Sequence, residues 1–275
     1  MLASLKRALR LFAAETSVAF WQFKVSEPHS LPAELIVSLT SYPKRFPTLA
    51  KTLESLLAQS VRPDRITLWI AHEDRDSLPP DVLDLPIEIW TCEDLRSYKK
   101  IIPALREFPK AYICTADDDI YYPRDWLKTL VSASAPGVIT CRRAHRPNYV
   151  DGDHAPYGTW EWCVVTDEPG DLFPTGCGGI LYPPGSLSPN VLDPAFLEIC
   201  PTADDVWLYM MAREAGSIYR QVGGTFHDIS WPGSQDEALM SRNLDGGNDH
   251  QIAAACDFLS ECLSASSSAR AGSTR

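Results

Sequence analysis

The stretch Ala111-Tyr112-Ile113-Cys114-Thr115-Ala116 runs without a break into Asp117-Asp118-Asp119, and this junction decides the fold. Its apolar half predicts a buried strand of a parallel sheet. Three adjacent carboxylates repel one another, so placing them at a buried sheet edge is costly unless a cation compensates. Carboxylate oxygens favour Mg²⁺ or Mn²⁺ over softer metals. We therefore expect a divalent metal at the triplet. The alternative is a solvated acidic turn, which fits poorly because Ile120-Tyr121-Tyr122-Pro123 follows directly.

The segments on both sides of this junction alternate between strand and helix patterns. Short apolar runs predict strands, and apolar residues at helical spacing predict the helices between them. Short connections of this kind imply right-handed crossovers, so we expect an α/β, Rossmann-like fold with a mostly parallel central sheet flanked by helices. The strands are expected at residues 35–39, 66–70, 87–90, 111–116, 179–182 and 218–222, and the helices at residues 49–57, 98–108 and 203–215. Pro103 should kink or shorten the second of these helices.

Composition divides the chain into three parts. Residues 1–30 form an amphipathic helical segment, residues 31–262 the main domain, and residues 263–275 a Ser- and Ala-rich tail that we expect to be disordered. Within the main domain, residues 143–177 are rich in Pro, Gly, Asp, His and Trp. Because this stretch carries many aromatic residues, it predicts a long, ordered, functional loop region and not a linker.

The N-terminal segment is the most basic part of the chain. Lys6, Arg7, Arg10 and Lys24 are opposed only by Glu15, and apolar residues alternate with these charges. This pattern predicts an amphipathic helix that lies either on a membrane surface or on the protein's own core. Both alternatives remain open at this stage.

The net charge and the spacing of the cysteines argue against two classes of protein, general nucleic-acid binders and zinc proteins. The 275 residues carry a formal net charge of −11, which argues against general nucleic-acid binding because such proteins need a basic face. None of the eight cysteines forms a C-x-x-C pair, so no zinc site is indicated. The chain shows no secretory signal and no apolar stretch near the ~20 residues that span a bilayer, so we expect a cytoplasmic protein with free thiols.

Polar residues gather where strands are expected to end, which is where open parallel sheets bind ligands. Asp204-Asp205 begin the helix at residues 203–215, so they are candidates both for capping that helix and for a general base. Lys100, together with Lys99 and Arg45, supplies cations that would suit a phosphate group. Thr40-Ser41-Tyr42 follow the first expected strand, and His72-Glu73 follow the second.

Three further features have both a structural and a functional interpretation. His227 is a candidate metal ligand, although a lone histidine is more often structural, and His250 is a weaker one. The glycine-rich stretch at residues 174–179 permits close approach to a ligand, but a strand follows it where a dinucleotide-binding motif would need a helix. Trp160 and Trp162 are candidates for a sugar-stacking surface or for core packing.

In this order and spacing, the motifs resemble those of glycosyltransferase A-fold enzymes, and especially the bacterial family 2-like transferases of surface-polysaccharide synthesis. The likeness covers about residues 34 to 250 and rests on five stretches. These stretches are Ile36 to Arg45, Lys100 to Leu105, the D-x-D-like element Thr115 to Pro123, Gly176 to Pro184, and Pro201 to Leu208.

The resemblance implies a role for each matching residue. Asp119 would ligate Mn²⁺ or Mg²⁺, Asp117 would contact the metal or the ribose, and Asp118 would orient the other two. Asp205 would be the general base of an inverting displacement, with Asp204 as the rival assignment because relatives often have Glu-Asp here. The residues expected near the nucleotide are Thr40, Ser41, Tyr42, Arg45, His72, Glu73 and Lys100.

These features predict a metal-dependent glycosyltransferase with a nucleotide-sugar donor and a saccharide or lipid-linked acceptor. The loop region at residues 143–177 would lie on the acceptor side, and the basic N-terminal helix would contact the inner face of the cell membrane. One alternative is a nucleotidyltransferase that makes sugar nucleotides. It usually has a glycine-rich loop after the first strand, and residues 40–45 contain no glycine. The other alternative is a non-catalytic carbohydrate-binding relative of the fold.

Overall fold

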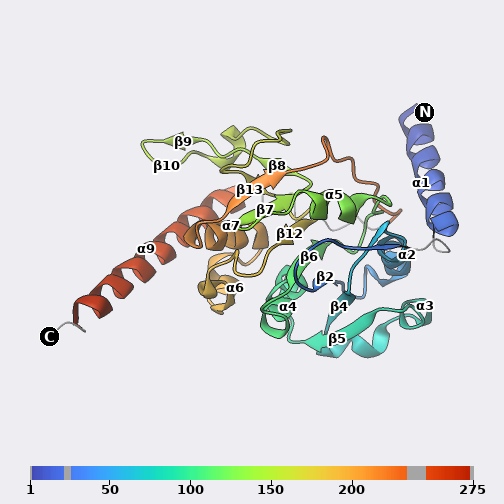
Figure 1. Cartoon of the computed structure of the whole chain (residues 1–275), viewed down its shortest axis with the longest axis horizontal. Helices are drawn as coiled ribbons and strands as arrows, with labels where there is room; N and C mark the ends of the chain where they lie inside the picture. Colours follow the sequence, from blue (N-terminus) through green and yellow to red (C-terminus); the bar gives the residue numbers. More distant parts are fainter. Residues whose placement is uncertain (1, 22–25, 234–245, 273–275) are drawn as a thin grey trace.

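The computed structural model describes residues 2–21, 26–233 and 246–272, and its centre is a seven-stranded sheet (Figure 1). The strand order is β13-β7-β12-β6-β2-β4-β5. Every neighbouring pair is parallel except the two pairs formed by β12, which is antiparallel to β6 and to β7. The expected mostly parallel sheet is therefore confirmed. The strands are β2 (Leu35–Thr40), β4 (Arg65–Ala71), β5 (Glu88–Cys92), β6 (Tyr112–Ala116), β7 (Val138–Cys141), β12 (Ile180–Tyr182) and β13 (Ile218–Gln221).

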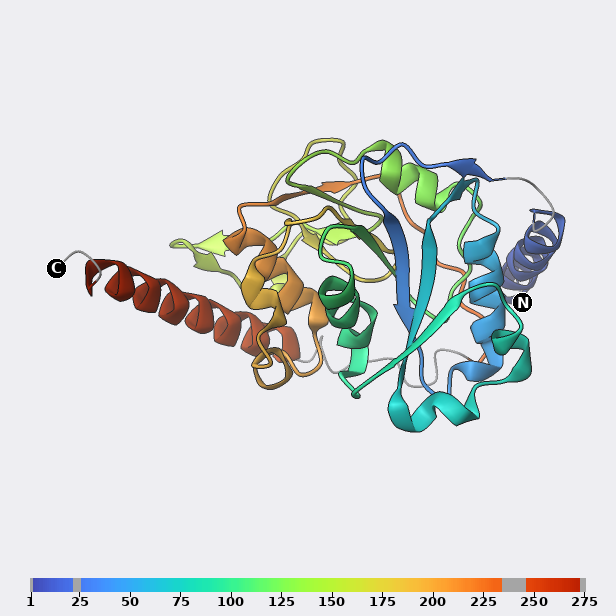
Figure 2. The same ribbon diagram turned by 60° about the horizontal axis from the view of Figure 1, so that its bottom comes forward.

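Helices cover both faces of this sheet (Figure 2). Alternate residues of a strand point to opposite faces, and in β2 Leu35, Val37 and Leu39 join the apolar cluster under α2 and α5. Ile36 points the other way, into a second cluster that contains residues of α4, α7 and α9. The covering helices are α2 (Phe46–Leu57), α3 (Pro80–Leu83), α4 (Ile102–Glu107), α5 (Trp126–Ser132), α6 (Phe196–Ile199), α7 (Asp204–Glu214) and α9 (Asn248–Gly272), with short 3₁₀ turns η1 (His72–Ser77), η2 (Arg96–Lys100), η3 (Tyr157–Thr159) and η4 (Pro189–Leu192).

The helix expected at residues 98–108 is shortened at Pro103, as the sequence indicates. It is divided into η2 and α4, with Pro103 in the first turn of α4, where its missing N–H leaves no hydrogen bond unmade. The tail expected to be disordered from residue 263 instead continues α9 to Gly272. Alanine is the strongest helix former, and alanines lie among the serines of this segment.

The region at residues 143–177 is ordered, as the sequence indicates, but it is built from short antiparallel strand pairs. Strand β8 (Ala144–His145) pairs with β11 (Phe173–Pro174), and β9 (Tyr149–Val150) pairs with β10 (Asp153–His154), both antiparallel. A further small pair joins β1 (Glu27–Pro28) to β3 (Val61–Arg62). The β8–β11 pair places one wall of loop residues beside the ends of β6 and β7.

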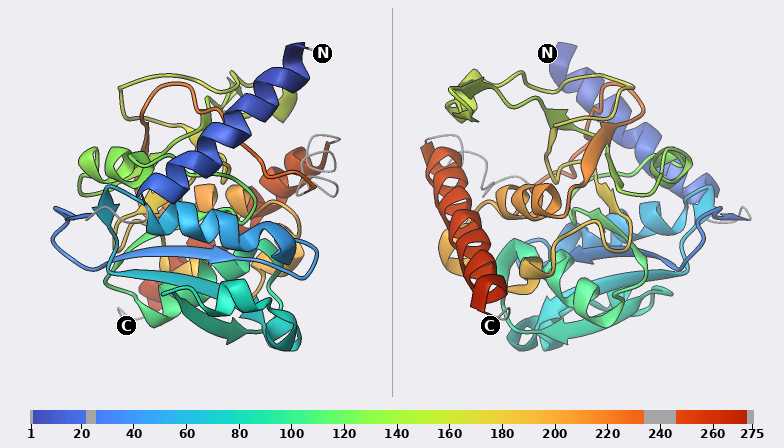
Figure 3. Two further views of the ribbon diagram at one scale, coloured as in Figure 1. Left: turned by 90° about the vertical axis from the view of Figure 1, so that its right-hand side faces the viewer. Right: turned by 60° about the vertical axis from the view of Figure 1, so that its left-hand side comes forward.

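Helices α1 (Leu2–Trp21) and α9 lie at opposite ends of the molecule (Figure 1), and α1 lies beside α2 (Figure 3, left). Helix α1 rests against α2 through buried Ala14 and Val18, and Glu15 pairs with Lys51 of α2 at 2.6 Å. The N-terminal helix is therefore docked on the protein's own core by one face. None of the described helices is long and apolar enough to cross a bilayer.

Candidate functional site

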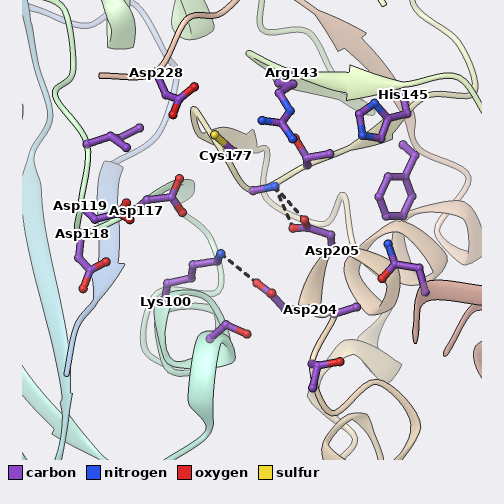
Figure 4. Close-up of a pocket in the computed structure, with 18 of the residues that line it drawn as sticks. Lys100, Asp117, Asp118, Asp119, Arg143, His145, Cys177, Asp204, Asp205 and Asp228 are labelled. Atoms are coloured by element: carbon purple, nitrogen blue, oxygen red, sulfur yellow. Dashed lines mark hydrogen bonds and ion pairs between the residues drawn. The ribbon is translucent and has the colours of Figure 1, made fainter. Parts of the chain in front are cut away.

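A cavity of about 480 Å³ opens at the carboxyl ends of β2 and β6, facing the loop region (Figure 4). It brings together residues that are far apart in the sequence. The lining residues that the sequence singled out are Tyr42, Arg45, Lys100, Asp117, Asp118, Asp119, Trp162, Asp204 and Asp205.

The backbone of the aspartate triplet is held in place by neighbouring elements. Thr52 of α2 donates its hydroxyl to the carbonyl oxygens of Asp118 and Ile120, at 3.0 Å each. The Trp231 N–H donates to the Asp119 carbonyl at 3.0 Å, and the Trp231 indole N–H donates to Thr52 at 2.8 Å. The turn after β6 is thus fixed before any ligand binds.

The three carboxylates have different partners. Asp119 is buried and ion-paired with Arg45, whose guanidinium also lies 3.9 Å from Asp118. The Ser41 hydroxyl donates to Asp118 at 2.5 Å. Asp117 makes no side-chain hydrogen bond within the described residues, although its backbone N–H donates to the Tyr122 hydroxyl at 2.6 Å.

The electrostatic state of the triplet favours an added cation. Burial, together with the other aspartates, raises the pKa of Asp117 to about 7, against the opposing effect of Lys100. Burial likewise raises the pKa of Asp118 to about 6, and the Ser41 hydrogen bond opposes this. A divalent ion beside these carboxyl groups stabilises their anionic form and so opposes the effect of burial and mutual repulsion on the pKa.

The donor set fits a hard divalent ion, because Asp117 and Asp119 offer carboxylate oxygens at the cavity. Among the described residues, no group of three or more His, Cys, Asp and Glu side chains is arranged to share one ion. Magnesium usually binds through one or two carboxylates and completes its shell with water and substrate phosphate oxygens. The site therefore suits an ion that arrives with a phosphate-bearing ligand.

The second acidic pair lies across the cavity, at the start of α7. Ala203 is the N-cap residue and Asp204 and Asp205 follow it, so neither aspartate occupies the capping position. Gln251 of α9 accepts the N–H groups of Thr202 and Ala203, at 3.1 and 3.0 Å, and so holds the segment that leads into the helix. Asp204 and Asp205 both line the cavity.

Asp204 and Asp205 have clearly different partners. Lys100 Nζ lies 2.9 Å from Asp204 Oδ2, so Asp204 is held in an ion pair. The Gly176 N–H donates to both oxygens of Asp205, at 2.9 and 3.0 Å. Burial and the neighbouring Asp204 raise the pKa of Asp205 to about 6, and Lys100 and Gly176 limit the rise.

Lys100 lies between the two acidic clusters. Its carbonyl oxygen accepts the Ser38 hydroxyl of β2 at 2.7 Å, which fixes the end of η2 against the sheet. Burial lowers the pKa of the Lys100 ammonium group, but the nearby carboxylates of Asp204, Asp117 and Asp205 raise it by more than burial lowers it. The net pKa is raised, so Lys100 remains protonated. A permanent positive charge at this place can attract phosphate oxygens from either side of the cavity.

Several predicted residues do not line the cavity. The Thr40 hydroxyl donates to the Trp69 carbonyl oxygen at 2.8 Å. Ser41 is buried, and its hydroxyl donates to the Asp118 carboxylate. His72 and Glu73 are exposed at the start of η1, after β4. His227 is also exposed, and its neighbour Asp228 lines the cavity in its place.

Sequence reasoning missed part of the loop wall. Arg143 and His145 line the cavity directly after β7, so the rule that ligands collect at the carboxyl ends of strands would have found them. Asp228 gave no sequence signal. Of the two tryptophans, Trp160 is buried core, whereas Trp162 is 40% exposed and lines the cavity. The glycine-rich stretch at residues 174–179 contributes Thr175, Gly176 and Cys177 to the lining. The lining residues that the sequence did not single out include Ser97, Tyr157, Phe173 and Asn248.

A side chain at Gly176 would press on two charged groups of the site. A Cβ at this position would lie 3.0 Å from Asp205 Oδ1 and 3.0 Å from Lys100 Nζ. We expect Gly176→Ala to lower turnover roughly 10-fold, less than the ~10²-fold cost of a full 1 Å misplacement. Steady-state kinetics would measure this. Gly170→Ala is the control, because a Cβ there meets nothing within 4 Å, and equal losses in the two variants would contradict the expectation.

No known protein family matches the sequence, and no curated protein matches it either. Solved structures with a similar course of the chain include the inositol-1-phosphate CTP transferase from T. maritima, at 14% identity and a TM-score of 0.45, covering 80% of this chain and 97% of that one. A 4-diphosphocytidyl-2C-methyl-D-erythritol synthase matches at 14% identity and a TM-score of 0.45, covering 78% of this chain and 99% of that one. GalNAc-T7 with UDP, GalNAc and Mn²⁺ matches at 11% identity and a TM-score of 0.41, covering 79% of this chain and 48% of that one. Likeness at this level leaves the activity to be argued from the site.

Proposed function

We propose that the chain is a metal-dependent glycosyltransferase that moves a sugar from a nucleotide-sugar donor to a saccharide or lipid-linked acceptor. One observation carries the proposal: two acidic clusters of different character face one cavity, with protonated Lys100 between them. One cluster suits a metal-bound diphosphate and the other suits a base. Exposed Trp162 on the loop wall offers an aromatic face against which a sugar ring can pack.

The different partners of the two aspartates support Asp205 as the base. Asp204 is neutralised by its ion pair with Lys100, whereas Asp205 faces the cavity and keeps its orientation through the Gly176 N–H. Asp205 would take the proton of an acceptor hydroxyl while that oxygen attacks the anomeric carbon and the bond to the diphosphate oxygen breaks. A single in-line displacement of this kind inverts the configuration at the anomeric carbon.

The donor would lie on the β2 and β6 side of the cavity. Asp117 and Asp119 would hold a divalent cation, which when bound stabilises the charge of the departing diphosphate. Lys100 would hold diphosphate oxygens by charge-assisted hydrogen bonds, and Tyr42 offers a ring to the nucleoside. Arg45 would have to share Asp119 with the cation, or turn toward phosphate.

A donor screen tests the proposal. Thermal unfolding of the purified protein would be followed with UDP-, GDP-, CMP- and dTDP-sugars, each with and without Mn²⁺. We expect one nucleotide class to raise the melting temperature only when Mn²⁺ is present, because a ligand that binds the folded state stabilises it. Stabilisation by nucleoside triphosphates with no response to any nucleotide sugar would favour a nucleotidyltransferase instead.

The pH dependence of kcat/KM follows from the environment of Asp205. Its pKa is raised to about 6, and a general base acts only when it has lost its proton. Activity at saturating Mn²⁺ should therefore fall as the pH drops through about 6 and level off above it. The residual activity of Asp205→Asn should lack this inflection, and an unchanged inflection in that variant would assign the titration to another group.

We further propose that α1 attaches the protein to the inner face of the cell membrane, where a lipid-linked acceptor of surface-polysaccharide synthesis would be presented. While Ala14 and Val18 face α2, the solvent side of the helix exposes Leu9, Phe12 and Phe20 at 60, 69 and 57%. Large exposed apolar side chains on a helix that also carries cations are typical of interfacial helices.

Liposome co-sedimentation tests this attachment without removing the docked face of α1. Changing Leu9, Phe12 and Phe20 together to serine should abolish binding to anionic vesicles. The control Val165→Ser removes an apolar side chain that is equally exposed but lies in the loop region. Equal binding by wild type and the triple variant would contradict the attachment.

A further inference from the structure

One wall of the cavity contains polar groups that have no partner. His145 is 1% exposed and Thr175 is 6% exposed, and within the described residues His145 Nε2 and Thr175 Oγ1 make no hydrogen bond. Arg143 Nε is buried and unpartnered as well. All three residues line the cavity. Because unpaired buried polar atoms are costly, a group of them on one wall indicates a ligand that would satisfy them.

The local fold places these three side chains together. Arg143 and His145 are two residues apart along an extended segment, so they point to the same side of it. The Thr175 N–H donates to the Arg143 carbonyl at 3.1 Å, which continues the β8–β11 pairing and sets Thr175 opposite Arg143. Figure 4 shows Arg143 and His145 above Asp205, away from the aspartate triplet.

The hydrogen-bonding character of the wall can be assigned from its contacts. His145 Nδ1 accepts the Cys163 N–H at 2.9 Å, and burial, together with Arg143, lowers the pKa of His145 to about 4. The imidazole is therefore neutral with its proton on Nε2, so Nε2 is a donor. The guanidinium of Arg143 only donates, and the hydroxyl of Thr175 can donate. The wall thus offers three donors and one positive charge.

Arg143 is also the cavity cation without a carboxylate partner in the described part of the chain. Arg45 is paired with Asp119, and Lys100 is paired with Asp204. A guanidinium matches carboxylate and phosphate oxygens by paired, charge-assisted hydrogen bonds. The available charge and the available donors therefore coincide on the same wall.

We infer that Arg143, His145 and Thr175 bind an anionic group, a carboxylate or a phosphate, carried by the acceptor. The inference rests on the proposed function, because the acceptor side is defined by Asp205 as base. An anion on this wall would lie on the Asp205 side of the cavity, apart from the diphosphate at the triplet. The enzyme would then select acidic acceptors, such as a uronic acid or a phosphorylated saccharide, over neutral ones.

Ligand-observed NMR titration tests the anion site in the absence of donor and metal. The probes are inorganic phosphate, methyl glucuronide and the neutral methyl glucoside. The full-length wild-type protein should bind the first two and show no specific binding of the third. Arg143→Gln should weaken both anions about 10- to 100-fold, as expected for the loss of charge-assisted hydrogen bonds, and Thr175→Val should weaken them less.

The matched control is Arg146→Gln. It removes the same charge three residues away, from a side chain that is 51% exposed and paired with Glu161 at 3.2 Å. This variant should bind all probes as the wild type does. Arg143→Lys, which keeps the charge but loses the planar fork, should recover only part of the affinity. Unchanged anion binding in Arg143→Gln, or equal loss in Arg146→Gln, would overturn the inference.

A second arm separates the acceptor from the donor as the source of the anion. Affinity for the nucleoside diphosphate chosen by the donor screen would be measured with Mn²⁺ in wild type and Arg143→Gln. Unchanged affinity supports an acceptor anion, whereas a loss of the same size as for glucuronide would assign the wall to the donor diphosphate. The NMR arm needs no nucleotide sugar, so it gives a result even if glycosyl transfer is not the activity.

Discussion

Replacing Asp205 with asparagine should lower turnover by about 10²- to 10⁴-fold, the range expected when a general base is removed. Asparagine has nearly the same shape, and its Oδ1 can still accept the Gly176 N–H that now reaches Asp205 at 2.9 and 3.0 Å. The cavity should therefore keep its form while losing the proton acceptor. Steady-state kinetics with the donor found in the screen would show the loss in kcat, with little change in donor affinity.

Asp204→Asn is the matched control, because it changes the neighbouring carboxylate and leaves the base in place. Its effect should be smaller than that of Asp205→Asn, and should be seen mainly in donor binding, since Lys100 loses its partner at 2.9 Å. The reverse ranking, with near-normal turnover in Asp205→Asn and none in Asp204→Asn, would assign the base to Asp204.

Replacing Asp117 with asparagine should lower turnover about 10²- to 10³-fold, the size of effect seen when a preorganised electrostatic group is lost. Asp117 lines the cavity and makes no side-chain hydrogen bond within the described residues, so its carboxylate is available for an ion. Electron paramagnetic resonance of Mn²⁺, titrated in the presence of the nucleoside diphosphate, should show weaker binding in the same variant. This measurement reports on the metal independently of turnover.

Asp118→Asn is the control for the metal prediction. The Ser41 hydroxyl holds Asp118 at 2.5 Å, so this residue orients the turn and is not the expected ligand. Its loss should weaken Mn²⁺ binding less than the loss of Asp117. If the two variants bound Mn²⁺ equally, or if Asp117→Asn bound it as tightly as wild type does, the metal would have to be placed elsewhere.

The sequence predicts secondary structure and site residues correctly wherever the local apolar pattern and the chemistry of the side chains agree. The apolar run before the triplet predicted β6, and the parallel sheet followed from short apolar runs separated by helical spacing. Asp204 and Asp205 were placed correctly at the start of a helix, and the structure separates them by their partners, Lys100 and Gly176. Which aspartate is paired depends on contacts over about a hundred residues of chain, and no local pattern carries that information.

The features that the sequence does not predict depend mostly on tertiary contacts between distant parts of the chain. The residues that lead into α7 are held by Gln251 of α9, a helix whose C-terminal part has the composition of a disordered tail. The antiparallel direction of β12 is set by pairing with β6 and β7, because its three residues have no directional signal of their own. The grouping of Arg143, His145 and Thr175 on one wall of the cavity depends on the β8–β11 pairing. Both strands are two residues long, which is too short to show a periodicity in the sequence.

The central claim is that the two acidic clusters serve glycosyl transfer in one cavity, and ³¹P NMR of the reaction products tests it most directly. The protein would be incubated with Mn²⁺, the stabilising nucleotide sugar and an acidic saccharide acceptor, with the much slower Asp205→Asn variant as the control. We expect a nucleoside diphosphate to appear together with a new glycoside. Formation of pyrophosphate and a nucleotide sugar from a nucleoside triphosphate and a sugar phosphate, with no transfer to the acceptor, would contradict the claim.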